Sequence, residues 1–223
     1  MSTSTDPSVT PEVRTLYIFG AGGHGREVAW LARQTVAPDV DIRFLADRDH
    51  CLTPSVNGIV LECWETAQLG ADSRFVVAVG DPGLRSQIAE RLARRGAVAG
   101  TLVHPRTEMS SNVDLGPGVV VCAGSVLTTE IRLAQHVHVN VSCSIAHDVQ
   151  IGEFSTLSPG VRIAGNVQVG ARVFLGIGAV VINGQPGAPL VIGDDAVVAA
   201  GACVTGRVAA GALVAGVPAV RKR

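Results

Sequence analysis

The sequence predicts a small N-terminal α/β domain with a parallel, Rossmann-like sheet, followed by an all-β domain that forms a parallel β-helix. The β-helix is indicated by an aliphatic residue that returns every six positions from Met109 to Val198. The α/β domain is indicated by apolar, strand-like runs that alternate with amphipathic segments before residue 100. The six-residue period breaks at a segment rich in glycine and proline, residues 183–189, which predicts a loop that leaves the β-helix.

The first part of the chain reads as alternating strands and helices. Each expected strand is a short run of β-favouring apolar residues, and each expected helix carries apolar residues at helical spacing. The strands are expected at residues 16–19, 42–46 and 75–79, and the helices at residues 26–34 and 84–95. These elements place the α/β domain at residues 15–103, after a polar lead-in at residues 1–14 that we expect to be disordered. The β-helix domain then takes residues 104–223.

A glycine turn joins the first expected strand to the first expected helix. Gly20, Gly22 and Gly25 fit the pattern G-x-G-x-x-G, and Asp47 follows about twenty residues later, as in dinucleotide-binding folds. Bare backbone N–H groups at a helix N-terminus bind phosphate without a Cβ in the way. An NAD-dependent oxidoreductase is therefore one hypothesis, although so short a domain fits a mononucleotide or a nucleotide-sugar diphosphate better.

The repeat in the second half of the chain fixes which side chains point inward. A period of six is a signature of a parallel β-helix, and three flat sides of one coil take eighteen residues. Residues two apart share a strand face, so a second, smaller set two positions before each aliphatic residue also points inward. The aliphatic positions are Met109, Leu115, Val121, Leu127, Leu133, Val139, Ile145, Ile151, Leu157, Ile163, Val169, Leu175 and Val181 and, after a five-residue insertion, Ile192 and Val198.

Composition excludes several classes of function. The net charge is -1 and no large Lys/Arg patch is visible, which argues against binding to nucleic acid. No apolar stretch reaches the roughly 18 residues of a membrane span, and no signal peptide is visible, so we expect a cytoplasmic protein with no membrane partner. The five cysteines form no C-x-x-C pair, so we expect neither disulfides nor a metal site.

Many short segments carry a resemblance that covers nearly the whole chain. They are residues 20–25, Asp47, residues 79–85, His104-Pro105, Asn140, His147-Asp148, residues 151–154, 158–160, 164–167, 174–176 and 200–202, and residues 216–219. In their order and spacing the sequence resembles the sugar acyltransferases of the left-handed β-helix superfamily. The similar branch has an N-terminal nucleotide-sugar domain and acetylates 4-amino sugars. The resemblance implies left-handed coils, a homotrimer, and acetyl-CoA in the groove between the β-helices of neighbouring subunits.

The resemblance also implies site residues. Those implied for the nucleotide sugar are Gly20, Gly22, Gly23, His24, Gly25, Asp47, Gly80, Asp81 and Arg85. Those implied for acetyl-CoA are Thr156, Gly165, Gly201 and Ala202. The similar enzymes often carry a second histidine nine positions after the catalytic one, and this chain has Thr156 there instead.

The base can be argued from the phase of the repeat. His147 falls at a corner, points outward and precedes Asp148, which can hold the imidazole in one tautomer; Glu153 is the alternative partner. Gly165 stacks one coil away and can offer its N–H to the thioester oxygen. Asn140 is either a polar contact in the active site or a residue that tolerates the turn. Cys143 points inward and is an inert thiol.

We therefore predict an acetyl-CoA-dependent N-acetyltransferase that acts on the 4-amino group of a nucleotide-linked amino sugar, with His147 as general base. Two other hypotheses remain open. One is a sugar O-acetyltransferase of the sialic-acid type, because a hydroxyl acceptor needs the same base and groove. The other is a non-catalytic trimeric scaffold that binds nucleotides. The nucleotide, the sugar and the length of the acyl chain are not determined by the sequence.

Overall fold

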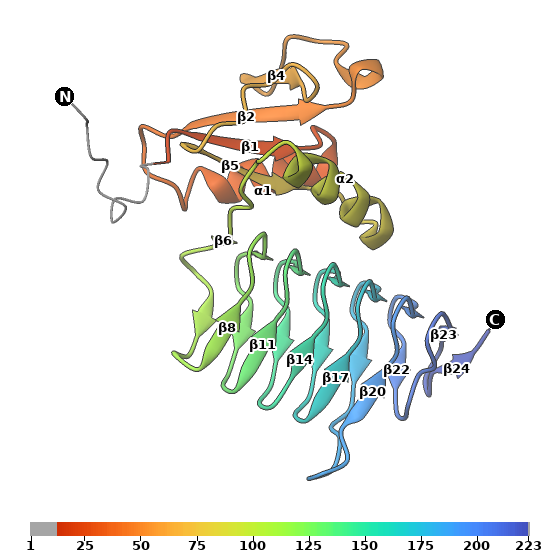
Figure 1. The fold of residues 1–223 in the computed structure, drawn as a ribbon. Helices are drawn as coiled ribbons and strands as arrows, with labels where there is room; N and C mark the ends of the chain where they lie inside the picture. The colour runs from red at the N-terminus through yellow and green to blue at the C-terminus, as the bar shows by residue number, and fades with distance from the viewer. Residues whose placement is uncertain (1–12, 223) are drawn as a thin grey trace.

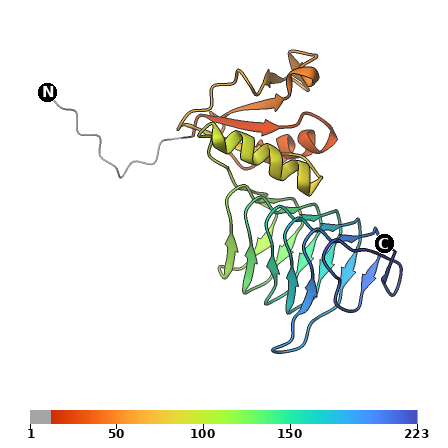
Figure 2. The ribbon, with the colours of Figure 1, turned by 45° about the vertical axis from the view of Figure 1, so that its right-hand side comes forward.

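The protein consists of an α/β domain that sits on one flank of a long coil (Figures 1 and 2). The structure, a computed structural model, describes residues 13–222. Of the predicted lead-in at 1–14, only Val13 and Arg14 are therefore described. The Arg14 N–H donates to the carbonyl of Asp72 at 2.8 Å, beside the first strand. The rest of the lead-in lies outside the described residues.

The α/β domain is built on a five-stranded sheet in the order β3-β4-β2-β1-β5, in which only β3 is antiparallel to its neighbour. Its elements are β1 (Thr15–Phe19), α1 (Gly23–Ala32), β2 (Asp41–Ala46), the 3-10 turn η1 (Arg48–His50), β3 (Ser55–Val56), β4 (Ile59–Cys63), β5 (Ser73–Val77) and α2 (Pro82–Arg94). The three predicted strands and both predicted helices are present. The β3–β4 hairpin at the sheet edge was not predicted.

The two helices cover opposite faces of this sheet, because alternate strand residues point to opposite sides. Leu16 and Ile18 pack with α1 in one apolar cluster, whereas Tyr17 and Phe19 pack with α2 in another. Each cluster continues into the coil, the first through Val120 and Cys122 and the second through Phe154. The α/β domain is thus attached to the coil by two apolar layers.

The coil has three flat faces, each a ladder of short strands. The β6 face holds β6 (Leu102–Val103), β9 (Val120–Val121), β12 (His138–Val139), β15 (Thr156–Leu157), β18 (Phe174–Leu175), β21 (Val197–Val198), β23 (Leu213–Ala215) and the antiparallel β24 (Val220–Arg221). The β7 face holds β7 (Glu108–Met109), β10 (Val126–Leu127), β13 (Ser144–Ile145), β16 (Arg162–Ile163), β19 (Val180–Val181) and β22 (Cys203–Val204). The β8 face holds β8 (Val113–Leu115), β11 (Ile131–Leu133), β14 (Gln150–Ile151), β17 (Val167–Val169) and β20 (Leu190–Ile192).

Strand pairing confirms the predicted coil of eighteen residues and the predicted fold class. Leu127 pairs with Ile145, which pairs with Ile163, in parallel register. The inward residues form one continuous buried column from Val119 to Val214. The first strand of the coil, β6, lies just before the domain boundary predicted at residue 104, and the division into domains stays a prediction.

A buried arginine connects the two domains. Arg85 of α2 is fully buried and has no carboxylate partner among the described residues; its guanidinium donates only to backbone carbonyls. The acceptors are the carbonyls of Val79 and Gly80 in its own domain and of His136, Phe154 and Ser155 in the coil. Burial lowers the pKa of Arg85 to about 9, so the group still carries its charge at neutral pH.

Two histidines of the coil are buried under the α/β domain. His136 stacks on Phe154, with ring centroids 5.0 Å apart. Burial, and then the charge of Arg85, lowers the pKa of His136 to about 4 and also lowers that of His138. Both imidazoles are therefore neutral at pH 7.

No helix in residues 13–222 is long and apolar enough to cross a membrane. The cytoplasmic location stays a prediction. Within the same residues, no cluster of three His, Cys, Asp or Glu side chains could hold a metal ion.

Acid should loosen the contact between the domains through His136. Its pKa is about 4 in the folded chain and about 6.5 in an unfolded one, so the unfolded state binds more protons between these values. The free energy of unfolding should therefore be highest above about pH 6.5. As the pH drops toward 4, it should fall by at most about 1.4 kcal/mol per pH unit for this histidine. Urea unfolding at pH 7 and pH 5 measures the change.

The matched variant is His136→Phe, because Phe154 occupies the same corner one coil later with the same positive φ. His136→Phe should show a shallower loss of stability in acid than the wild type. The exposed His50→Ala should keep the wild-type slope. An unchanged slope in His136→Phe would contradict this prediction.

Candidate functional site

A histidine and a carboxylate meet at the corner between the β7 and β8 faces. His147 Nδ1 lies 2.7 Å from a carboxylate oxygen of Asp148, and both side chains are well exposed. Asp148 has a φ of 58°, a left-handed conformation that asparagine and aspartate tolerate at such corners. Because the ionised carboxylate accepts a hydrogen bond at Nδ1, it favours the tautomer in which Nε2 is free to accept a proton.

Gly165 lies against the imidazole one coil further on. A Cβ at this position would come within 2.5 Å of the His147 ring, so only glycine leaves the ring where it is. The Gly165 N–H makes no hydrogen bond within residues 13–222. The structure thus brings His147, the carboxylate of Asp148 and the free N–H of Gly165 together, as the eighteen-residue spacing predicts.

The loop at residues 183–189 closes this corner into a pocket of about 530 Å³. It is held by the Gly184 N–H, which donates to the carbonyl of Gly165 at 3.0 Å, and by the Asn166 side-chain amide, which donates to the carbonyl of Gln185. The lining residues are His147, Asp148, Gly165, Asn166, Asn183, Gly184, Pro186 and Gly187. Sequence reasoning missed Asn166, although it lies eighteen residues after Asp148.

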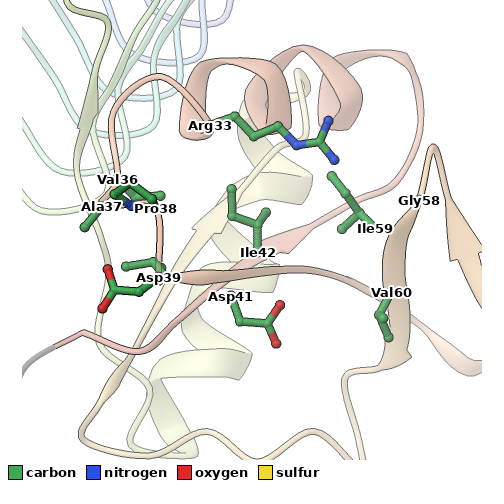
Figure 3. Close-up of a pocket in the computed structure, with 11 residues that line it drawn as sticks. Arg33, Val36, Ala37, Pro38, Asp39, Asp41, Ile42, Gly58, Ile59 and Val60 are labelled. Atoms are coloured by element: carbon green, nitrogen blue, oxygen red, sulfur yellow. The ribbon is translucent and has the colours of Figure 1, made fainter.

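A larger pocket of about 560 Å³ lies on the α/β domain (Figure 3). Its walls include Arg33, Asp39 and Asp41, with Ile42 and Ile59 between them. Asp41 begins β2, so this pocket lies at the amino ends of the parallel strands. Ligands of open α/β sheets bind at the carboxyl ends, where the glycine turn is. The corner of His147 is therefore the better candidate for chemistry despite its smaller volume.

Two kinds of glycine occur in the turn between β1 and α1. Gly20 has a φ of 103°, and a Cβ on Gly25 would lie 1.9 Å from the Gly20 carbonyl oxygen, so both are required by the turn itself. Gly22 and Gly23 are exposed, and a Cβ on either would meet nothing within 4 Å. The fold has no need of glycine at these two positions, which open the N-terminus of α1 to an anion.

Comparisons with known proteins show the family to which the chain belongs. A family model described as the PglD N-terminal domain matches residues 15–92. A GDP-perosamine N-acetyltransferase from Escherichia coli O157:H7 is 30% identical over 181 residues, which cover 79% of this chain and 81% of that protein. The chain belongs to the hexapeptide-repeat sugar N-acetyltransferases.

Two solved structures extend the match over nearly the whole acetyltransferase. PerB from Caulobacter crescentus, in complex with CoA and GDP-perosamine, is 30% identical with a TM-score of 0.81, covering 94% of this chain and 97% of that one. The acetyltransferase domain of PglB from Neisseria gonorrhoeae, in complex with acetyl coenzyme A, is 31% identical with a TM-score of 0.84, covering 94% and 99%. The predicted family and the predicted acyltransferase class are confirmed, and the predicted co-substrate is the one bound in the PglB structure.

Three residues implied by the resemblance have buried side chains in this N-acetyltransferase. Arg85 is not available to the nucleotide sugar, because it is buried and its guanidinium is used by carbonyls. Thr156 is not open to acetyl-CoA: it points out of the coil, but the α/β domain covers it and its hydroxyl donates to Gly80. Ala202 is fully buried and points into the coil. The phase of the repeat cannot reveal what another domain covers.

The remaining predicted residues fall into two groups. At the carboxyl ends of the α/β strands, Asp47 forms an ion pair with Arg91, and Asp81 accepts a hydrogen bond from the Leu84 N–H as the cap of α2. At the corner between the β6 and β7 faces lie Asn140 and Gly201. The Asn140 side chain donates to the Leu157 carbonyl at 2.7 Å, which supports the turn. Neither Asn140 nor Gly201 lines the pocket of His147 within one chain.

Alanine substitutions distinguish the glycines that the turn requires from the glycines that it does not require. Gly25→Ala should destabilise the acetyltransferase by more than about 3 kcal/mol, because its Cβ would overlap the Gly20 carbonyl. The free energy of unfolding of Gly22→Ala should lie within about 1 kcal/mol of the wild-type value. Alanine fits at this N-cap position and is only a weaker cap than glycine. Thermal and urea unfolding give both values. A stable Gly25→Ala variant would show that the turn is built differently.

Proposed function

We propose that this enzyme transfers an acetyl group from acetyl-CoA to the 4-amino group of a nucleotide-linked amino sugar, with His147 as general base. The observation that carries the proposal is the exposed His147-Asp148 pair beside Gly165, in a pocket closed by a loop. A protein that only assembled α/β domains would have no use for this arrangement. The relatives that bind CoA and GDP-perosamine support the choice of donor and acceptor class.

The chemistry follows from the geometry of the corner. The amine nitrogen attacks the thioester carbonyl carbon, and its proton passes to Nε2 of His147, directly or through a water molecule. The Asp148 carboxylate stabilises the imidazolium that forms, and the Gly165 N–H donates to the developing oxyanion. The C–S bond then breaks, and the departing CoA thiolate takes up the proton held by the His147 imidazolium, which restores the neutral base.

The nucleotide sugar is bound by the α/β domain through its diphosphate. The N-terminus of α1, bare at Gly22 and Gly23, supplies N–H donors and the positive end of the helix dipole. His24 lies in the same turn. Because the relatives at about 30% identity include enzymes named for GDP-perosamine, a GDP-linked 4-amino sugar is the first substrate to test.

One chain cannot complete this site. The α/β domain covers the β6 face, whereas the His147 corner joins the other two faces and lies at the far side of the triangular coil; the loop at 183–189 projects there in both views (Figures 1 and 2). A second copy must therefore bring its sugar to this base. We propose the homotrimer expected for the family, in which the β7 face of one copy meets the next.

A row of exposed apolar residues, here called the ridge, supports the β7 face as the contact between copies. Val141, Pro159 and Ile177 are spaced by eighteen residues along the corner between the β6 and β7 faces, and all three are exposed, Ile177 by 63%. The outward residues of the β8 face are instead polar or charged over most of its length, as at Arg132 and Gln150. In a ring of copies the ridge would meet the His147 corner of the neighbour, which would carry Asn140 and Gly201 into the site.

Removal of the base tests the proposed mechanism. His147→Ala should reduce kcat with acetyl-CoA and GDP-perosamine by about a hundredfold to ten-thousandfold, the usual contribution of a positioned general base. Its affinity for CoA and its oligomeric state should not change. Gly165→Ala, which would push the ring aside, should lose activity in the same way. Near-normal turnover of His147→Ala would end the assignment.

Charge on the ridge tests the proposed assembly. Ile177→Glu should convert the trimer to monomers that keep the fold and lose activity. The new carboxylate is exposed in the monomer, but assembly of the trimer would bury it without a partner. Light scattering gives the mass in solution. Gln150→Glu, on the β8 face, is the matched control and should stay trimeric. A trimeric Ile177→Glu variant would place the interface on another face.

A further inference from the structure

Two neighbouring eighteen-residue turns of the β-helix each contact one segment of the α/β domain. His138 and Thr156 face each other in parallel register on the β6 face. His138 Nδ1 shares a hydrogen bond with His24 Nε2 at 3.2 Å, and the Thr156 hydroxyl donates to the Gly80 carbonyl at 2.9 Å. The spacing of two strands, about 4.8 Å, therefore sets the positions of His24 and Gly80 relative to each other.

These two turns follow adjacent strands of the sheet. His24 lies in the first turn of α1, which follows β1, and Gly80 lies in the turn after β5. The two strands pair in parallel. Their carboxyl ends consequently meet at the edge where the proposed function places the diphosphate. A shift of either turn would change the distance between the groups that approach the nucleotide.

The side chain of His138 is hard to explain by packing alone. In the same row one coil earlier lies Val120, which packs with the α1 cluster. His138 is 1% exposed, and its Nε2 has no hydrogen-bond partner within the described residues. Burial of a polar atom without a partner is unfavourable, so a valine would suit a purely structural contact better. Within residues 13–222, the one hydrogen bond of this imidazole is the one to His24.

The same turn is held from its other side. His24 Nδ1 lies 3.2 Å from a carboxylate oxygen of Glu27. The ring of His24 is therefore held between Glu27 on α1 and His138 on the coil, at the N-terminus of the helix. A side chain fixed at both nitrogens loses little rotamer freedom when a ligand binds.

We propose that His138 and Thr156 are positioning residues that hold the two nucleotide-binding turns of the α/β domain at a spacing set by the coil. The proposal rests on the function proposed above for these turns. It gives Thr156, which has no access to acetyl-CoA, a role toward the other substrate. The coil thus serves the nucleotide through the β6 face of the same chain and the thioester through the opposite corner.

Equilibrium binding tests the proposal. The affinities of the full-length protein for GDP, UDP, dTDP and CoA are measured by calorimetry, and the tightest of the three nucleotides is used for the variants. His138→Val and Thr156→Val should each weaken nucleotide binding by about tenfold, the usual effect of a lost positioning hydrogen bond, with CoA binding unchanged. His138→Asn and Thr156→Ser, which keep a polar group at each position, should restore most of the affinity.

Cys122→Ala is the matched control, because Cys122 is buried in the same contact but touches neither turn through a hydrogen bond. It should lower thermal stability without changing nucleotide affinity. Wild-type affinity in His138→Val and Thr156→Val would overturn the positioning role and leave the proposed function intact. An equal loss in Cys122→Ala, or no rescue by His138→Asn and Thr156→Ser, would also overturn it. If the wild type bound none of the three nucleotides, the proposed function would fail first and this inference with it.

Discussion

The buried guanidinium of Arg85 is the contact on which the arrangement of this enzyme depends. It is fully buried, carries a charge and is surrounded by carbonyl oxygens from both domains. A buried charge without such partners would cost several kcal/mol, so the α/β domain cannot slide along the coil and leave this buried cation without its acceptors. Arginine suits this position because its planar fork carries five donors that point in fixed directions. The two apolar clusters add area to the contact, but they would tolerate sliding.

The coil turns a simple repeat into a set of fixed distances. Inward aliphatic residues stack in one column, so each outward residue keeps its height and its face. This brings His147 against Gly165 at one corner. At another corner it places the Asn140 side chain where it donates to the Leu157 carbonyl. On the β6 face it brings His138 and Thr156 under the two turns of the sheet. A rigid support of this kind favours reactions that depend mainly on the placement of two bound molecules.

The proposed function divides the work of the enzyme between two ends of one chain. The α/β domain, proposed to bind the nucleotide sugar, lies on the β6 face, and His147, the proposed base, lies at the corner opposite to it. The proposed trimer would explain why the pocket on a single copy includes His147 but neither Asn140 nor Gly201. It would also cover the exposed apolar residues Val141 and Ile177.

The sequence by itself determined the fold class, the inward and outward phase of the coil, and the pairing of His147, Asp148 and Gly165. Each of these depends on a short period or on residues eighteen positions apart. In a regular repeat, such relations follow directly from the spacing of residues in the sequence. The tertiary structure decided what the α/β domain covers. The resemblance implied ligand contacts for Arg85 and Thr156, and the phase of the repeat placed Thr156 on the outside, yet docking of the second domain buries both side chains. The same docking gave His138 a partner that lies 114 residues away, a contact that no local pattern encodes.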